Sequence, residues 1–406
     1  MRILMVTDFY WPFLGGVEQH VRTLSHTLHE RGHHVAVATL WGEGLAETEM
    51  DLGVPVYRLH SSSQRANWLY SEPKRPWAPP FPDPEITLSL RQIIRHEQPD
   101  VVHGHDWLAR SFLPLKPWSK AKLVVSLHYY TRSCAKKNLM FRDTPCSGPG
   151  IVKCLECGAN HYGRAKGMAA VLANWGMSAV ERAAVDMFVT VSRATSEGNR
   201  LAGTHLPQQV VPNFLPNSST KPQDSLDPYV AQLPNQEFML FVGDLRPMKG
   251  LDVLLTAYAA LQDAPPLVLI GKAWPDTPTE LPPNTLVLHN WPNYAVMEAW
   301  RRSSIALVPS IWPEPFGIVV IEAMAGATPV IASRIGGIPE IVVDGESGML
   351  VPPGDPVALR MAMECLLKDA NLRQRMGRAA KQRASDFEAG AVVPQIEAIY
   401  QQVMAS

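Results

Sequence analysis

Short apolar runs alternate with longer segments of helical periodicity along most of the chain. Near the N-terminus, the run Ile3 to Val6 precedes the pair Gly15-Gly16, and apolar residues then recur at helical spacing until Gly32. The next apolar runs of this half are Val35 to Leu40, Val101-Val102, Leu123 to Leu127 and Met187 to Val191. Short buried runs that alternate with helices are typical of a parallel sheet covered by helices.

A change in composition divides this pattern. Residues from Val210 to Pro234 are rich in Pro, Asn, Ser and Asp and have no periodicity, which predicts a domain boundary. The alternation then resumes, with a helix expected at Leu251 to Leu261 and strands at Phe238 to Val242, Leu267 to Ile270, Leu286 to Leu288, Ile305 to Val308 and Pro329 to Ala332. We therefore expect an α/β protein of two Rossmann-like, doubly wound parallel-sheet domains, 1–212 and 213–386, which face a ligand cleft between them.

Composition excludes several classes of function. The 406 residues have a net charge of -1, from 37 Lys plus Arg and 38 Asp plus Glu, which lacks the cationic excess of a nucleic-acid binder. No uncharged apolar stretch reaches the roughly 18 residues that a transmembrane helix needs. The apolar run near the N-terminus is too short for a signal peptide, so we expect a cytoplasmic protein.

Two carboxylates stand out in the second half. Glu314 lies between two prolines, which keep it out of a helix, whereas Glu322 lies within the regular apolar run IVVIEAMA. Their eight-residue spacing corresponds to roughly 12 Å at the helical rise of about 1.5 Å per residue. This separation suits one extended nucleotide sugar better than one shared proton. The backbone N–H groups of Phe316, Gly317 and Ile318 would stand at the helix start, where a phosphate is favoured.

Longer motifs around these carboxylates carry a resemblance. The segment PEPFGIVVIEA, followed by PVIASRIGGIPEIVVDGESGMLVPPGD, resembles the signature of the large family-four group of retaining, nucleotide-sugar-dependent glycosyltransferases, marked by E-x7-E. FVGDLRPMKG, GGVEQHV and VVSLH extend the resemblance along the chain. It implies the GT-B architecture, with the C-terminal helix 387–406 packed back on the first domain.

The resemblance also implies roles for individual residues of the second domain. Glu314 is expected to bind hydroxyls of the donor sugar and Glu322 those of the nucleotide ribose. Lys249 is expected to contact the donor diphosphate, where its charge would stabilise the departing phosphate. The family usually has Arg where this chain has Asp244, and whether Arg246, two residues later, replaces that charge stays open.

In the first domain the resemblance implies two further donor contacts. Gly15 and Gly16 match a glycine loop that closes on the donor phosphates, and His128 matches a histidine that faces the reaction centre, so His128, Lys249 and Glu314 are the catalytic candidates. Transfer in this family requires no metal. The leaving phosphate would take the proton of the acceptor hydroxyl in a front-side displacement, although the sequence alone does not distinguish this mechanism from a double displacement.

The sequence defines the substrates less well than it defines the type of reaction. A UDP-sugar is the expected donor, and the acceptor is a small alcohol, a lipid or a saccharide. The sugar, the base and the acceptor depend on loops such as His289 to Asn293 and Leu40 to Pro84, and the oligomeric state is open. The alternatives are a nucleotide-sugar epimerase on the same fold and a two-lobed binding protein without catalysis. A dinucleotide oxidoreductase is disfavoured because the glycine pair lacks G-x-G-x-x-G spacing.

Four of the five cysteines follow the His128 strand within 24 residues: Cys134, Cys146, Cys154 and Cys157. They indicate either a structural zinc site or four reduced thiols in an ordinary insertion. His103 and His105, at a strand end, are interpreted as acceptor-cleft or structural residues rather than metal ligands.

The segment Thr131 to Lys166 is also basic. It favours either an anionic acceptor or peripheral contact with the inner membrane face, or it is a solvated surface. Its seven basic residues are Arg132, Lys136, Lys137, Arg142, Lys153, Arg164 and Lys166, against Asp143 and Glu156.

Overall fold

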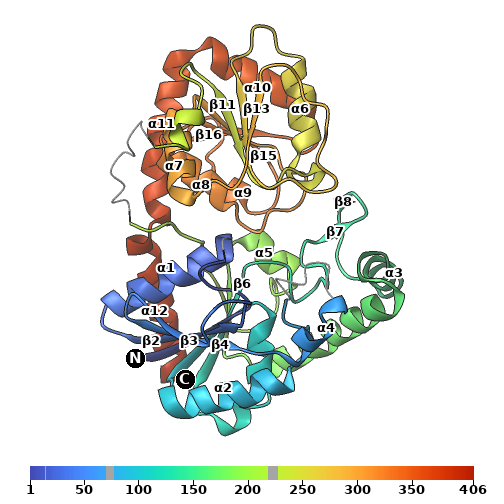
Figure 1. The fold of residues 1–406 in the computed structure, drawn as a ribbon, viewed down its shortest axis with the longest axis vertical. Coiled ribbons are helices and arrows are strands. Elements are labelled where there is room, and N and C mark those ends of the chain that lie inside the picture. Colours follow the sequence, from blue (N-terminus) through green and yellow to red (C-terminus); the bar gives the residue numbers. More distant parts are fainter. Residues whose placement is uncertain (14, 70–76, 218–226) are drawn as a thin grey trace. The chain divides into compact units, whose positions relative to one another are not determined.

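The structure, a computed structural model, describes residues 1–13, 15–69, 77–217 and 227–406 (Figure 1). The chain forms two compact units. Unit 1 comprises Met1–Arg142, Cys146–Asn213 and Ala389–Ser406, and unit 2 comprises Asp143–Pro145 and Phe214–Glu388. The chain therefore passes from the first unit to the second between Asn213 and Phe214, one residue after the boundary expected from composition.

The elements before this boundary follow the expected alternation. Helices and strands occur in the order β1 (Arg2–Thr7), α1 (Gly16–Glu30), β2 (His34–Leu40), β3 (Thr48–Asp51), β4 (Val54–Leu59), α2 (Pro84–Glu97), β5 (Val101–His105), β6 (Lys122–Leu127), β7 (Met140–Phe141), β8 (Thr144–Pro145), α3 (Ile151–Tyr162), α4 (Arg164–Ala184), β9 (Met187–Thr190), α5 (Arg193–Gly198) and β10 (Gln208–Val210). Short 3-10 helices occupy Ser62–Leu69, Trp107–Phe112 and Lys116–Trp118.

The elements after the boundary repeat the pattern. They are β11 (Met239–Val242), α6 (Leu251–Ala259), β12 (Leu267–Ile270), β13 (Thr285–Leu288), α7 (Asn293–Arg302), β14 (Ile305–Val308), α8 (Ile318–Ala325), β15 (Val330–Ser333), α9 (Ile338–Ile341), β16 (Gly348–Val351), α10 (Pro356–Lys368), α11 (Ala370–Ala384) and α12 (Ala389–Ala405). Three 3-10 helices lie at Val230–Gln232, Pro247–Lys249 and Ser385–Phe387.

Each unit contains one large sheet. The eight strands of unit 1 have the order β10-β9-β6-β5-β1-β2-β4-β3, and all neighbours are parallel except β3 and β4. The six strands of unit 2 have the order β13-β12-β11-β14-β15-β16 and are all parallel. The prediction of two parallel α/β sheets is confirmed. In such sheets, the loops at the carboxyl ends of the strands form ligand sites.

One stretch differs from the expectation. The segment Leu40 to Pro84, interpreted from sequence as loop, contributes the hairpin of β3 and β4 to the edge of the first sheet. Its strands are short, and polar residues such as Glu49 and Asp51 interrupt the apolar alternation, which is why periodicity did not reveal them.

The terminal helix α12 belongs to unit 1, where it contacts α1 and β6. The Arg31 guanidinium donates two hydrogen bonds to the Glu397 carboxylate, at 2.8 and 2.6 Å, and the Tyr400 hydroxyl reaches the imidazole of His103. These contacts tie the end of the chain to the unit in which the chain begins.

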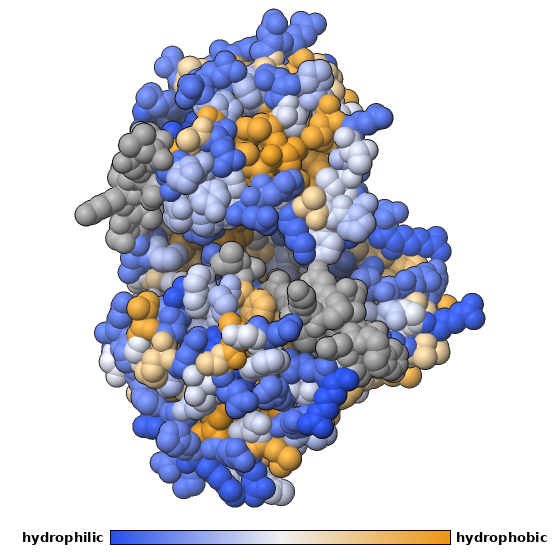
Figure 2. All heavy atoms as spheres, in the orientation of Figure 1, coloured by the Kyte–Doolittle hydropathy of each residue, from blue (hydrophilic) through white to orange (hydrophobic). Residues whose placement is uncertain are grey.

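The surface is predominantly polar on the face drawn in Figure 2, with smaller hydrophobic areas between the charged residues. Throughout the described ranges, no helix combines the length and the apolar character needed to span a membrane.

Candidate active site

An ion pair joins two of the residues that the sequence singled out in unit 2. Lys249 ends the 3-10 turn after β11, and Glu314 lies on the loop between β14 and α8. The Lys249 ammonium donates to Glu314 Oε1 at 2.6 Å, and the Ser310 hydroxyl donates to the same oxygen at 2.8 Å. Glu314 is only 6% exposed. The ammonium also stands 4.8 Å from the centre of the Trp312 ring, so its position is defined from two sides.

Two glycines allow the loops that carry this pair to approach each other. A Cβ on Gly250, which has φ of +77°, would lie 1.8 Å from the carbonyl oxygen of Pro309. A Cβ on Gly336, with φ of +58°, would lie 2.1 Å from the carbonyl oxygen of Glu314. Both positions combine left-handed backbone with a close approach of main chain, which only glycine satisfies. The GGIPE segment therefore supports the Glu314 loop from behind.

The second carboxylate, Glu322, is buried in α8. It is 6% exposed, and Asn293, at the start of α7, donates from Nδ2 to its Oε1 at 3.0 Å. Burial raises the pKa of Glu322 to about 7, from its ordinary value of 4.5. A carboxylate held in this way is short of hydrogen-bond donors, which the hydroxyls of a bound polyol would supply.

The start of α8 separates the two carboxylates. Gly317 has φ of +109° and caps the helix, which begins at Ile318. The first N–H groups of a helix have no acceptor within the helix itself and attract anions. The side chain of Phe316 is buried and packs edge-on against Phe387, so at this position only the backbone is available to a ligand.

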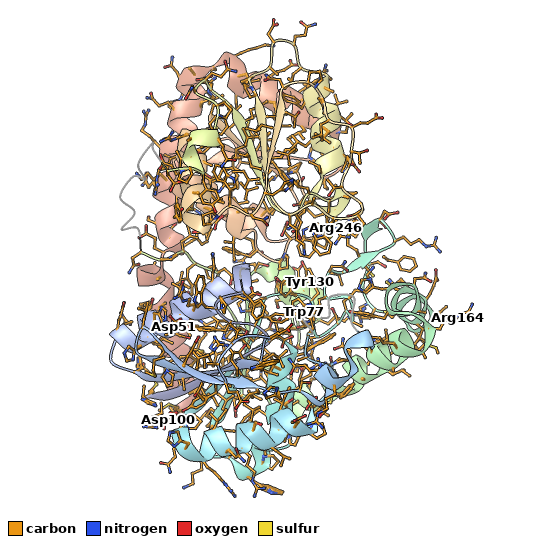
Figure 3. The ribbon with its side chains drawn as sticks, in the orientation of Figure 1. Asp51, Trp77, Asp100, Tyr130, Arg164 and Arg246 are labelled. Atoms are coloured by element: carbon orange, nitrogen blue, oxygen red, sulfur yellow. The ribbon has the colours of Figure 1, made fainter. Side chains whose placement is uncertain are left out.

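Arg246 is paired within unit 2. The guanidinium of Arg246, which is labelled in Figure 3, donates to both carboxylate oxygens of Asp276, at 2.9 to 3.1 Å. It also stacks 4.6 Å from the ring centre of Trp274. The family usually has an arginine at the position of Asp244, and Arg246 could replace its positive charge. In this structure, Asp276 balances the charge of Arg246.

Unit 1 supplies the glycine loop and a cluster of histidines. Gly15 has extended backbone and precedes α1, which begins at Gly16. A Cβ on Gly15 would lie 2.3 Å from Oε2 of Glu18, so this turn leaves little room for a side chain.

Four buried histidines gather at the carboxyl ends of β5 and β6. His105 Nδ1 and His128 Nε2 are 2.9 Å apart and share a hydrogen bond, and their rings are stacked with centroids separated by 5.2 Å. His20, from α1, places its ring edge-on against His128 at 4.8 Å. His103 lies between the Tyr400 hydroxyl, at 2.6 Å, and the Ser126 hydroxyl, at 2.7 Å.

Burial keeps these imidazoles neutral. It lowers the pKa of His128 to about 4 and that of His103 to about 3, and it lowers the pKa of His20 and His105 well below 6.5. In a neutral pair, one ring must donate and the other accept, so the bond between His105 and His128 couples the tautomers of the two rings. His128 is thus a neutral, oriented group and not a cation at physiological pH.

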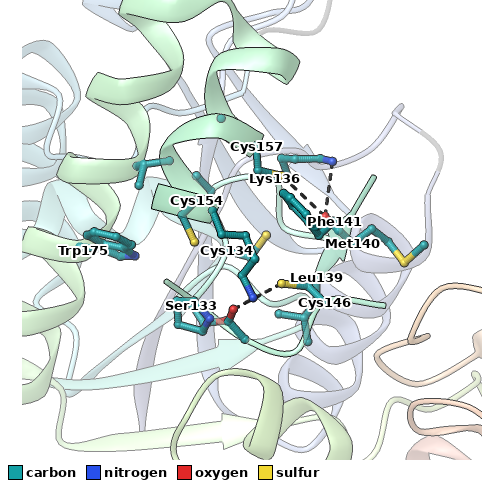
Figure 4. Close-up of a pocket in the computed structure, with 16 residues that line it drawn as sticks. Ser133, Cys134, Lys136, Leu139, Met140, Phe141, Cys146, Cys154, Cys157 and Trp175 are labelled. Carbon is teal, nitrogen blue, oxygen red and sulfur yellow. Dashed lines mark hydrogen bonds between the residues drawn. The ribbon is translucent and has the colours of Figure 1, made fainter. Parts of the chain in front are cut away.

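The same cluster is the only group within the described part of the chain whose side chains already have metal-ligand proximity. Ligand atoms of His20, His105 and His128 all lie within 4.8 Å of one another. The four clustered cysteines are free thiols that line one pocket (Figure 4), but they do not form such a close group.

Sequence reasoning missed three polar partners in these sites. Ser310, on the loop after β14, and Asn293, at the start of α7, hydrogen-bond the two carboxylates, and neither has a recognisable sequence signal. His20 had a signal, because it shares the buried face of α1 with Val17, Val21 and Leu24. A histidine on an apolar helix face requires a polar partner, which here comes from strands about a hundred residues away.

Two family models match the chain. Residues 14–216 match Glycosyltransferase Family 4, and residues 228–383 match glycosyl transferases group 1. Together the two matches cover both units apart from short ends and the link.

Individual proteins are similar over different lengths. D-inositol 3-phosphate glycosyltransferase from Corynebacterium diphtheriae is 35% identical over 178 residues, which are 40% of this chain and 42% of that protein. Glycogen synthase from Mycobacterium tuberculosis is 27% identical over 423 residues, covering 96% of this chain and 91% of that protein. Among known structures, Anabaena Alr3699/HepE in complex with UDP has a TM-score of 0.71 and 18% identity, with coverage of 99% of this chain and 100% of that one.

Proposed function

The chain belongs to glycosyltransferase family 4, a family of retaining enzymes with the GT-B fold that use nucleotide-sugar donors, and on that premise we propose how it performs the transfer. The donor is a UDP-sugar, from which a hexosyl group moves to an acceptor hydroxyl with retained anomeric configuration and without a metal ion. The observation that carries this proposal is the Lys249–Glu314 pair, held at 2.6 Å beside the start of α8.

The residues of unit 2 match the parts of such a donor. The ribose lies against Glu322. The two ribose hydroxyls donate hydrogen bonds to the carboxylate, and these bonds offset the free-energy cost of burying its charge. The diphosphate lies at the start of α8, where the N–H groups of Gly317 and Ile318 and the Lys249 ammonium face its oxygens. Glu314 then accepts from hydroxyls of the sugar. Lys249 leaves Glu314 for the phosphate in this step.

Charge development explains why no metal is required. As the glycosidic bond breaks, negative charge builds on the departing phosphate, and Lys249 together with helix N–H groups stabilises it. The departing phosphate oxygen takes the proton of the acceptor hydroxyl on the same face of the sugar. This front-side displacement needs no protein nucleophile, and the neutral His128 acts by hydrogen bonding to the donor sugar, assisted by the glycine loop of Gly15 and Gly16.

The acceptor is proposed as a class. The relatives include an enzyme named for inositol 3-phosphate and one named for glycogen, so acceptors with several hydroxyl groups fit the family range. We place the reaction in the cytoplasm, with peripheral contact at the inner membrane face where the acceptor is a lipid. Uridine as the base is part of the proposal, and the UDP complex of a structural neighbour supports it.

Product analysis tests this proposal. The protein is screened by thermal shift against nucleoside diphosphates, and the best donor is then incubated with polyol, lipid and saccharide acceptors. A new glycoside with the anomeric configuration of the donor is expected. Lys249→Ala and Glu314→Gln should lose most transfer, whereas the exposed-residue controls Lys368→Ala and Glu346→Gln should keep it. Conversion of the donor to an altered nucleotide sugar without acceptor, or near wild-type turnover in Lys249→Ala, would contradict the proposal.

A further inference from the structure

The four clustered cysteines lie outside the site described above. Cys134 stands in the turn after β6, Cys146 follows β8, and Cys154 and Cys157 occupy successive turns of α3. Although these positions come from three separate segments, all four line the same pocket of unit 1 (Figure 4). A pocket wall that gathers four thiols in a protein with only five cysteines is a specific donor set.

We propose that this pocket is a structural zinc site in which Cys134, Cys146, Cys154 and Cys157 are the four ligands. Zinc bound by four thiolates is tetrahedral, with zinc–sulfur distances of about 2.3 Å. All four positions would be filled, so the site has no place for a substrate. The sulfurs are further apart in this structure than in a bound site, and the cation would draw them inward.

Backbone groups already point toward the sulfurs. The Cys134 sulfur accepts from the N–H groups of Lys136 and Leu139, and Cys154 Sγ accepts from the N–H of Gly150 at 3.4 Å. Bonds from backbone N–H groups stabilise thiolates rather than neutral thiols, because charged acceptors form stronger hydrogen bonds. These N–H groups favour negative charge on two of the four sulfurs. The other two, Cys146 Sγ and Cys157 Sγ, donate as thiols to the carbonyl oxygens of Gly148 and Met140, at 3.4 and 3.7 Å, so zinc binding would replace these two contacts.

Nearby cations fit the charge of the proposed site. Four thiolates and one Zn²⁺ have a net charge of -2. Lys136 and Lys153 both line the pocket, and the Lys136 side chain hydrogen-bonds Cys157. Other residues of the lining are apolar and include Met140, Phe141 and Trp175 (Figure 4).

Burial raises the pKa of Cys134 and of Cys157. Zinc binding changes this balance: each zinc–sulfur bond forms as an S–H bond breaks, and the protons leave to solvent. No oxidant or reductant takes part.

The surrounding segment explains what the metal would stabilise. Lys137, Leu139 and Arg142 all have positive φ, at 65°, 52° and 53°, a conformation that residues with side chains rarely adopt. Such backbone persists where other contacts enforce it. Ile151 and Val152, at the start of α3, are 70% and 78% exposed, so apolar burial contributes little there. A cation that joins the turn of Cys134 to α3 supplies the missing constraint.

Metal analysis of the purified full-length protein tests the proposal directly. The chain is produced in zinc-supplemented cells and kept reduced, and zinc is measured in the wild type, Cys134→Ser, Cys157→Ser and the control Cys365→Ser, which changes the exposed fifth cysteine on α10. We expect one zinc per chain in the wild type and in Cys365→Ser, and loss of most of it in the other two variants. Folded wild-type protein without zinc would overturn the proposal.

A second measurement covers variants that fail to fold. Cobalt exchanged into the wild-type protein should show the visible bands of tetrahedral Co²⁺ and sulfur-to-metal charge transfer in the near ultraviolet, and X-ray absorption of the zinc form should show sulfur neighbours at about 2.3 Å. Nitrogen neighbours, together with zinc that is lost in His105→Asn and retained in the cysteine variants, would place the metal at the histidine cluster and overturn the assignment.

Discussion

Replacing Glu322 by Gln should increase the stability of the protein and weaken donor binding. Glu322 is 6% exposed, and its burial outweighs the hydrogen bonds from Asn293 and Trp300, so ionising it in the folded protein is unfavourable. Gln has the same shape without the charge. The variant should therefore be more stable than the wild type at any pH at which the carboxylate is ionised in the unfolded wild-type chain, and it should bind the donor more weakly.

The size of the stability difference between Glu322→Gln and the wild type follows from the pKa of Glu322. Burial raises the pKa of Glu322 to about 7 from 4.5. A carboxyl with a raised pKa contributes its stability below the unfolded pKa and loses it as the pH rises through the folded pKa. The difference of about 2.5 pKa units corresponds to about 3 kcal/mol, at about 1.4 kcal/mol per unit. The advantage of Glu322→Gln should thus grow from about 1 kcal/mol at pH 5 to about 3 kcal/mol at pH 8.

Thermal unfolding of wild type and variant at pH 5, 6, 7 and 8 measures this difference. For a unit the size of Phe214–Glu388, about 3 kcal/mol corresponds to a melting-temperature shift of about 6 to 12 °C. The exposed Glu346→Gln is the matched control and should show no shift that depends on pH. A difference between Glu322→Gln and wild type that is the same at pH 5 and pH 8 would refute the reasoning.

The substitution Glu322→Gln should weaken donor binding, although it increases stability. Ribose hydroxyls donate to an ionised carboxylate, so wild-type affinity for UDP should fall as the pH is lowered below about 7, by up to tenfold per pH unit. Glu322→Gln should bind UDP weakly and lose this pH dependence. Titration calorimetry at several pH values measures both, and equal pH dependence in wild type and variant would mean that the ribose does not meet Glu322.

Three further predictions concern the other parts of the site. Lys249→Ala should lower kcat by about 10²- to 10³-fold, with a smaller effect on donor KM, because the lysine acts mainly on charge that develops during transfer. Steady-state kinetics measures both constants, and an unchanged kcat would count against that role. Gly250→Ala should reduce activity and lower the melting temperature, because its Cβ would lie 1.8 Å from the Pro309 carbonyl oxygen; wild-type behaviour would show that the loops can separate freely. The side-chain amide of His105→Asn can replace Nδ1 as the hydrogen-bond partner of His128, whereas His105→Leu cannot provide one. His105→Asn should therefore keep more activity and preserve the ring-nitrogen NMR shifts of His128. Equal loss of activity in both variants would show that His105 acts by packing alone.

The fold could be predicted from the sequence to the extent that its information is local. Runs such as Leu267 to Ile270 are buried on both faces and read as strands without further knowledge. The hairpin of β3 and β4 escaped because edge strands carry weaker apolar patterns. Glu314 and Glu322 were recognisable because one loop and one helix, contiguous in sequence, carry both.

The remaining features of the site depend on contacts between distant residues. The ion pair of Lys249 with Glu314 spans 65 residues, and the bond between His105 and His128 joins two adjacent strands separated by a crossover. Neither spacing nor composition indicates such pairs. Similarly, Arg246 is a candidate for a donor contact from its position, but nothing in the sequence indicates its bidentate partner Asp276.

A crystal structure with an intact, non-transferable UDP-sugar analogue would show where the donor binds on unit 2. We expect ribose hydroxyls within hydrogen-bond distance of Glu322, diphosphate oxygens at the start of α8 in contact with Lys249, and sugar hydroxyls on Glu314. A ribose bound away from Glu322, or a diphosphate that contacts neither Lys249 nor α8, would contradict this placement.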